Sequence, residues 1–185
     1  MAHKSTHKFL LILFLLGVGA CSSKKNTTMS RAYHNLTSYY NYYYNAYDSY
    51  KTGIKRAESN YKYNYTLTLP MLLVGDEQVT GTVSGDMDRT INKCTMLIKK
   101  HSITVKPKRK EGQREKKDKM FYEKPEYVNW VDDAYLMVGK GHFYKQDYFP
   151  AIETFWYIIK QYTDWPIKYD AYLWLSRTYT EMGKF

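Results

Sequence analysis

Residues 133–159 read DAYLMVGKGHFYKQDYFPAIETFWYII, and they decide the fold of this chain. Their first four letters, Asp-Ala-Tyr-Leu, return at residues 170–173, which is 37 residues later. Recurrence at a fixed period of roughly 20–50 residues is typical of arrays in which each unit buries its apolar face against its neighbour. The C-terminal part of the chain is therefore predicted to contain an internal repeat.

The spacing within the repeat resembles that of a tetratricopeptide unit, a hairpin of two antiparallel helices. Gly139 and Ala151 are small, as required where two such helices cross closely. The expected packing positions are Val138, Gly139, His142, Tyr148, Ala151, Phe155, Ile158, Leu175 and Tyr179. We predict an all-α fold in which residues 127–185 form an α-solenoid of tetratricopeptide repeats. The second repeat is incomplete, so we expect the array to continue, because a repeat needs a neighbour to bury its apolar face.

Tyrosine is abundant, with 21 residues, and many of them lie in residues 30–101, which we predict to be a Tyr-rich helical region. Within it, residues 26–63 carry apolar side chains every three or four positions, which predicts a helical hairpin with a break at Asn45. The two helices would bury Tyr33, Leu36, Tyr40, Tyr43 or Tyr44, and then Tyr47, Tyr50, Ile54 and Ala57. Tyrosine rings also stack on sugars, but the helical spacing favours packing between helices.

The stretch after this hairpin is predicted as a loop because it contains glycines at positions 75, 81 and 85. A helix is expected to begin at Ser84 or Asp86 and to end near Lys100. Cys94 on this helix is interpreted as a small buried apolar residue. Cys94 and His101 share a helix face, but two ligands without a third do not make a metal site.

The sequence contains no Gly-rich phosphate loop, no nucleophile elbow and no zinc-ligand spacing. Asp132 and Asp133 are interpreted as charges at the start of a helix, where the helix dipole favours them. We therefore expect a non-enzymatic protein without a cofactor or a metal.

The formal net charge is +10, and much of it comes from residues 102–126, which carry many charges and no apolar periodicity. The basic residues of this segment include Lys106, Lys108, Arg109, Lys110, Arg114, Lys116, Lys117 and Lys119. We interpret the segment as a flexible basic linker. The functional alternative is contact with anionic lipid through residues 106–119. Nucleic acid is not expected as a partner, because aromatic residues for base stacking are not interleaved.

Residues 1–20 have the layout of an export signal, with Lys4 and Lys8 before a short apolar run. The sequence VGAC at residues 18–21 resembles a bacterial lipobox, which implies cleavage before Cys21 and acylation of its thiol. A lipoprotein cysteine carries about two or three acyl chains, which are enough to anchor a protein stably. Residues 21–29 would then form a lipid-anchored tether.

The residues directly after Cys21 include no acidic side chain. For a bacterial lipoprotein this implies a lipid-anchored position on the periplasmic face of the outer membrane. The membrane is then the first expected partner of the chain.

The order of these features is similar to that of the SprE/PorW family of lipoproteins in the Bacteroidota. The residues that carry the resemblance are His34, Asn35, Leu36, Tyr39 to Tyr44, Tyr47, Gly53, Ile54, residues 65–70, residues 132–136, Gly139 and Lys140. The resemblance implies a non-enzymatic scaffold in type IX protein secretion, and in some species in gliding motility. Its helical repeats would bind other protein components of the secretion machine in the periplasm.

Two alternatives remain open. One is a SusD-like glycan-binding lipoprotein, in which exposed tyrosine and tryptophan rings would hold sugars. The other is a BamD-like scaffold for outer-membrane assembly, whose repeats have similar spacing. Oligosaccharide binding would favour the first, and co-purification with barrel-assembly components would favour the second.

Overall fold

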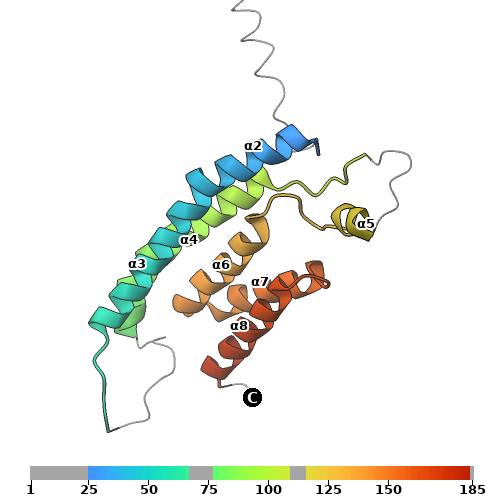
Figure 1. The fold of residues 1–185 in the computed structure, drawn as a ribbon. Coiled ribbons are helices and arrows are strands. Elements are labelled where there is room, and N and C mark those ends of the chain that lie inside the picture. The colour runs from blue at the N-terminus through green and yellow to red at the C-terminus, as the bar shows by residue number, and fades with distance from the viewer. Residues whose placement is uncertain (1–24, 67–76, 109–115, 184–185) are drawn as a thin grey trace, which may run out of the picture.

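The computed structural model describes residues 25–66, 77–108 and 116–183, and within these ranges every regular element is a helix (Figure 1). The elements are α2 (Thr28–Ser38), η1 (Tyr39–Tyr43), α3 (Tyr44–Asn60), α4 (Glu77–His101), α5 (Lys116–Tyr122), α6 (Val131–Tyr144), α7 (Tyr148–Gln161) and α8 (Ile167–Glu181). The predicted all-α class is confirmed for this part of the chain. None of its helices is both long and apolar enough to cross a lipid bilayer.

The helices α2, η1 and α3 form one continuous rod that lies along α4 (Figure 1). The predicted break at Asn45 is therefore wrong. η1 is a π-helical turn, in which the Tyr44 N–H donates to the Tyr39 carbonyl five residues earlier. The Asn45 side chain donates to the carbonyls of Tyr40 and Asn41, at 3.3 and 3.1 Å. Asn45 thus bonds to carbonyl groups inside the rod, and the helix continues through it.

The π turn keeps one face of the rod against α4 over its whole length. The buried residues of this seam are small or polar, namely Ser30, His34, Ser38, Ala46, Ser49, Gly53 and Ala57. Ser38 and Ala46 are eight residues apart, whereas an α-helix returns to nearly the same face after about seven. η1 absorbs the extra residue, as a π turn does. The helices approach closely, since a Cβ added to Gly53 would lie 2.6 Å from Met87 Cε.

α4 runs straight through the loop predicted around Gly81 and Gly85, so that prediction is wrong. Val79, Val83 and Met87 follow one another at intervals of four residues, and all three are buried. Both glycines are exposed, and a Cβ added to either would meet no atom within 4 Å. Burial of an apolar side chain contributes roughly 1.5–3 kcal/mol, which outweighs the cost of about 1 kcal/mol for a glycine in a helix.

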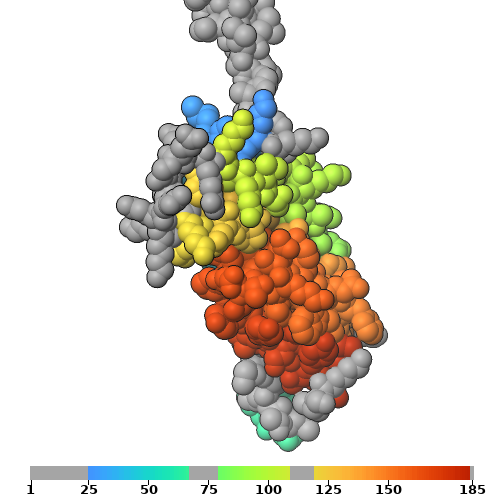
Figure 2. Space-filling model, turned by 90° about the vertical axis from the view of Figure 1, so that its right-hand side faces the viewer, coloured from blue at the N-terminus to red at the C-terminus, as the bar shows by residue number. Residues whose placement is uncertain are grey.

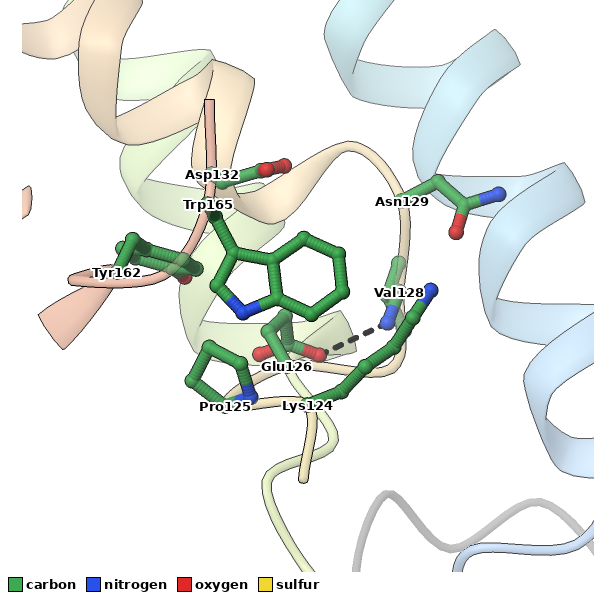
Figure 3. A pocket seen from close by; sticks show the side chains of 8 residues that line it. All are labelled: Lys124, Pro125, Glu126, Val128, Asn129, Asp132, Tyr162 and Trp165. Carbon is green, nitrogen blue, oxygen red and sulfur yellow. Dashed lines mark hydrogen bonds between the residues drawn. The ribbon is translucent and has the colours of Figure 1, made fainter. Parts of the chain in front are cut away.

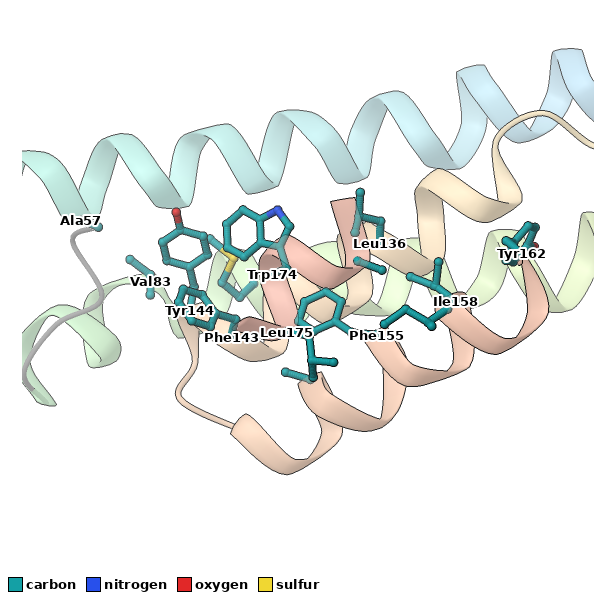
Figure 4. Close-up of a cluster of buried hydrophobic side chains, with 14 of the residues drawn as sticks. Ala57, Val83, Leu136, Phe143, Tyr144, Phe155, Ile158, Tyr162, Trp174 and Leu175 are labelled. Atoms are coloured by element: carbon teal, nitrogen blue, oxygen red, sulfur yellow. The ribbon is translucent and has the colours of Figure 1, made fainter. Parts of the chain in front are cut away.

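The C-terminal helices pack in succession, and they share a core with the rod. α6 contacts α7, α7 contacts α8, and α8 also contacts α6. Two buried clusters each combine residues of α4 with residues of α6. The larger cluster includes Phe143, Phe155 and Trp174 together with Val83 of α4 (Figure 4). The Tyr-rich region and the region of the repeat are therefore joined in one packed body.

Glu126 fastens together the two ends of the segment predicted as a basic linker, residues 102–126. Its buried carboxylate accepts a hydrogen bond from the Ser102 hydroxyl at 2.6 Å. It also accepts hydrogen bonds of 2.8–2.9 Å from the backbone N–H groups of Ile103, Tyr127 and Val128. On α5, the ring of Phe121 packs against the second buried cluster. The end of α4 is thus bonded directly to the chain that leads into α6.

Candidate interaction surfaces

A row of large apolar residues runs along the rod on the side away from the seam. We call it the outer row, and it consists of Met29, Tyr33, Leu36, Tyr40, Tyr44 and Tyr47. Each of these residues is between 44% and 80% exposed. The prediction that these tyrosines and Leu36 pack between helices is therefore wrong, since the helices meet through the small residues of the seam.

The tyrosines that flank the outer row hold the rod to the helices behind it. Tyr39 and Tyr43 pack on Trp130, with ring centroids 4.5 and 5.0 Å from that of the tryptophan. Tyr42 packs on the end of α4, where Lys100 Nζ donates to its hydroxyl at 3.0 Å. Burial also raises the pKa of Tyr43, which keeps its hydroxyl protonated. The wide rings thus occupy the flanks and the outer side, and the narrow seam is left to small residues.

The outer row can bind an apolar or planar partner. Its members follow one another at intervals of three or four residues, which places them on one stripe of the helical surface. Accessible apolar stripes mark sites of protein contact, and tyrosine rings also stack on flat ligands. η1 lies within the row, and π turns are frequent at functional sites. The surface presents aromatic rings and alkyl groups, so it is suited to binding a partner.

Exposed aromatic residues also occur on α7 and α8, which form much of the face seen in Figure 2. The large exposed residues of these helices are Phe149, Trp156, Tyr157, Tyr169, Tyr172 and Leu173. Trp156 Nε1 donates to the Tyr179 hydroxyl at 3.4 Å, which links the two helices. Trp174 is buried instead, with the charged groups of Lys140 and Arg177 5.1 and 4.8 Å from its ring. These helices therefore offer a second apolar surface.

A groove of about 390 Å³ lies where α4, α6 and α7 meet. Ile98, Val138 and the rings of Tyr135 and Tyr157 line much of it. The two rings lie 4.7 Å apart, and burial raises the pKa of Tyr135. The groove is apolar enough to receive a side chain of a partner, and it brings the predicted position Val138 to the surface.

The other predicted packing positions lie in the repeat helices. Ala151, Phe155 and Ile158 are fully buried, and Leu175 is buried as well. Gly139 faces Phe155 so closely that an added Cβ would lie 2.4 Å from its ring. The half-buried positions are Val138, His142, Tyr148 and Tyr179.

Three further predictions concern residues at the edge of the fold or outside it. His142 lies at the rim of α6, with its Nδ1 3.5 Å from Asp147 Oδ2. Lys106 and Lys108 are exposed at the start of the basic segment. Cys21, the predicted lipidation site, lies outside the described residues, so its modification stays a prediction.

A small hollow of about 110 Å³ lies between the end of the basic segment and the end of α7 (Figure 3). Trp165 lines it together with the carboxyl groups of Glu126 and Asp132. Burial, with the neighbouring charge of Asp133, raises the pKa of Asp132 to about 6. Glu126 is committed to hydrogen bonds with the surrounding backbone and Ser102. Its carboxylate therefore stabilises the turn before α6. The hollow follows from the packing of the chain around these hydrogen bonds, which we call the clamp at Glu126.

Sequence reasoning missed two buried polar pairs between the rod and α4. His34 Nδ1 lies 2.9 Å from His101 Nδ1, and both residues are buried. The buried Asp86 carboxylate lies 2.6 Å from Arg56 Nη1. The available signal was the spacing of Ser30, His34 and Ser38 at intervals of four residues. The outer row has the same period and is far more apolar, so hydrophobic periodicity selects the wrong face.

The side chains of the described ranges do not gather three His, Cys, Asp or Glu residues into a group that could hold a metal ion. No protein-family model matches the chain, and no curated protein matches it at a significant level.

Proposed function

We propose that this protein is a non-enzymatic scaffold of tetratricopeptide type that binds other components of a type IX secretion machine. Lipid on Cys21 would hold it to the periplasmic face of the outer membrane. The observation that carries the proposal is the outer row, six large apolar residues that stay accessible on a rod whose opposite face is packed on α4. An accessible stripe of this kind is suited to contact with another protein.

The arrangement of α6, α7 and α8 supports the tetratricopeptide part of the proposal. α8 carries the second copy of the repeat, and it contacts both helices of the first copy. The first two helices cross closely at Gly139 and Phe155, as the repeat spacing requires. Stacked hairpins of this type present extended binding surfaces.

The partner part of the proposal is tested with Tyr40→Glu combined with Tyr44→Glu. Both residues are exposed, so the charges should spare the fold and disrupt an apolar contact. A matched control places the same two changes at Tyr63 and Tyr65, which are exposed beyond the end of α3. After crosslinking in membranes of the native host, recovery of type IX ring or translocon proteins should fall at least about tenfold for the first variant.

The control variant should recover these proteins as the wild type does. Equal recovery by both variants would show that the outer row is not part of the interface. Recovery of barrel-assembly factors by the wild-type protein, in place of secretion components, would favour the BamD-like alternative.

The membrane part is tested separately with Cys21→Ala. Loss of the acylated thiol should release the protein into the soluble periplasmic fraction. Continued sedimentation with outer membranes would contradict the lipid anchor and leave the partner test unaffected.

A glycan-binding role is the second candidate, because the exposed rings of Tyr33, Tyr40, Tyr44 and Tyr47 offer stacking planes for sugars. Titration of the chain with oligosaccharides, followed by tyrosine fluorescence, tests this role. Saturable binding that is lost in the Tyr40→Glu and Tyr44→Glu variant would support the SusD-like alternative. A flat titration would rule that role out for the sugars used.

A further inference from the structure

Four basic side chains line one pocket at the start of the rod. Lys25 precedes α2 and Arg31 lies near its start, whereas Lys106 and Lys108 come from the chain that follows α4. Figure 1 shows these two stretches and α5 at the same end of the molecule. The pocket has a volume of about 770 Å³, which lies within the roughly 300–1,000 Å³ of ligand sites. Segments distant in sequence thus build one positively charged cavity.

Hydrogen bonds hold this pocket in shape. The Asn26 side chain donates to the Val105 carbonyl at 2.6 Å, which ties the chain after α4 to the start of α2. The same side chain accepts a hydrogen bond from Arg31 Nη1 at 2.6 Å. The Arg31 guanidinium also lies over the Phe121 ring, with its Cζ 5.0 Å from the ring centroid. Asn26 therefore both closes the pocket and orients its arginine.

The positive charge of the pocket is not balanced by the described residues. No aspartate or glutamate is among the described residues that line it, and no carboxylate of the described ranges pairs with any of the four basic groups. Arg31 donates to Asn26 and to the Thr28 hydroxyl, which are neutral acceptors. A guanidinium has five N–H donors, so several remain for a ligand. Among the described residues, the lining of this site therefore carries a net positive charge, which attracts an anion.

The lining of the pocket also contains apolar groups, from Val105, Pro107 and Phe121. Val105, which lines it, is 50% exposed. Met29 and Met120, each next in sequence to a lining residue, are 80% and 61% exposed. Exposed apolar side chains around a basic site are suited to the boundary between lipid headgroups and acyl chains. A free anion in solution would gain nothing from these apolar groups.

We infer that the pocket binds the phosphate group of an anionic phospholipid headgroup. Arginine binds phosphate through two parallel N–H donors, and lysines add point charges around it. Basic pockets of this kind recognise the headgroups of anionic lipids. The inference stands on the pocket itself, although the proposed tether would favour it. Cys21 is four residues before Lys25, and four residues extend at most about 14 Å.

Co-sedimentation of the full chain with vesicles tests the inference without acylation. Vesicles of phosphatidylcholine are compared with vesicles that also contain phosphatidylglycerol. The apolar run at residues 9–19 partitions into both, so the ratio of the two affinities reports the headgroup. For Lys106→Gln combined with Lys108→Gln, the preference for phosphatidylglycerol should fall about thirty-fold. The matched control, Lys55→Gln combined with Lys62→Gln, removes the same charge from exposed residues at the far end of the rod and should leave the preference within about twofold.

A charge-neutral variant separates a built pocket from diffuse attraction. Asn26→Ala keeps every basic group but removes the tie to Val105, so the preference should fall several-fold. Equal losses in both lysine variants, with no loss for Asn26→Ala, would show that net charge alone is responsible and would overturn the inference. Saturable binding of inorganic phosphate without any preference for phosphatidylglycerol vesicles would assign the pocket to a free anion and would also overturn it. Neither outcome bears on the anchor at Cys21, which the fractionation experiment tests.

Discussion

Gly139 and Gly81 are helical glycines with opposite surroundings. A Cβ at Gly139 would lie 2.4 Å from the fully buried ring of Phe155, whereas a Cβ at Gly81 would meet no atom within 4 Å. Gly139→Ala should therefore lower the free energy of unfolding by about 1–3 kcal/mol through overpacking. Gly81→Ala should raise it by about 0.5–1 kcal/mol, because alanine favours the helix. Urea denaturation measures both, and an unchanged or higher free energy of unfolding for Gly139→Ala would contradict the close crossing of α6 and α7.

The histidine pair makes stability depend on pH. Burial lowers the pKa of His34, and burial with the charges of His34 and Lys100 lowers the pKa of His101 to about 4. Glu126 acts in the opposite direction on His34. An unfolded histidine binds a proton from about pH 6.5 downward, whereas His101 in the folded chain does so only near pH 4, so His101 destabilises the fold progressively across this window. The lowered pKa of His34 acts in the same direction.

Replacing His101 with glutamine should flatten this dependence. Asp132, whose pKa is raised to about 6, favours the fold as the pH falls, so the wild-type profile combines both effects. The difference in unfolding free energy between wild type and His101→Gln, measured by urea denaturation at several pH values, isolates the histidine contribution. It should shrink between pH 6.5 and pH 4, and a constant difference would contradict a neutral buried pair.

At the scale of elements, the packing of the rod on α4 depends on the position of the extra residue that η1 accommodates. Deleting Asn41, which is exposed within η1, would turn the π turn into α-helix and keep Ser38 and Ala46 on one face. Deleting the exposed Lys51 would instead rotate Gly53 and Ala57 out of the seam by about 100°. The Lys51 deletion should cost about 2–4 kcal/mol more than the Asn41 deletion, as measured by urea denaturation. Equal costs would show that the π turn does not set the register.

The elements also show what sequence patterns can and cannot reveal. The repeat at Asp133 and Asp170 was enough to predict helices there, because its spacing reports packing directly. Periodicity predicts that the rod is helical, but it does not predict which face of the rod is buried. It identifies a stripe of apolar residues and leaves open whether the stripe faces a neighbouring helix or solvent. The small residues of the seam are weakly apolar, and the tyrosines outweigh them in any hydrophobic count. The outer row was therefore found in the sequence and assigned to the interior.

At the scale of the whole molecule, the shared core predicts a single unfolding transition. Both buried clusters combine residues of the rod with residues of α4 and α6, so neither the rod nor the repeat helices can lose their packing alone. The four tryptophans, at positions 130, 156, 165 and 174, all lie among the C-terminal helices and their entry, whereas circular dichroism reports every helix. Fluorescence and circular dichroism should give the same urea midpoint. A separate early transition in circular dichroism would mean that the rod unfolds independently.

The clamp at Glu126 has a consequence for engineering and for evolutionary variation. It joins Ser102 and Ile103 to the turn before α6, so the intervening chain is a closed loop whose length does not set the position of either helix. Doubling the length of such a loop costs only about 0.6 kcal/mol in closure entropy. Positions in this stretch that lie outside the pocket-lining residues 105–108 and outside α5 are therefore natural insertion points, where a fluorescent reporter or an affinity epitope can be placed without moving α4 or α6.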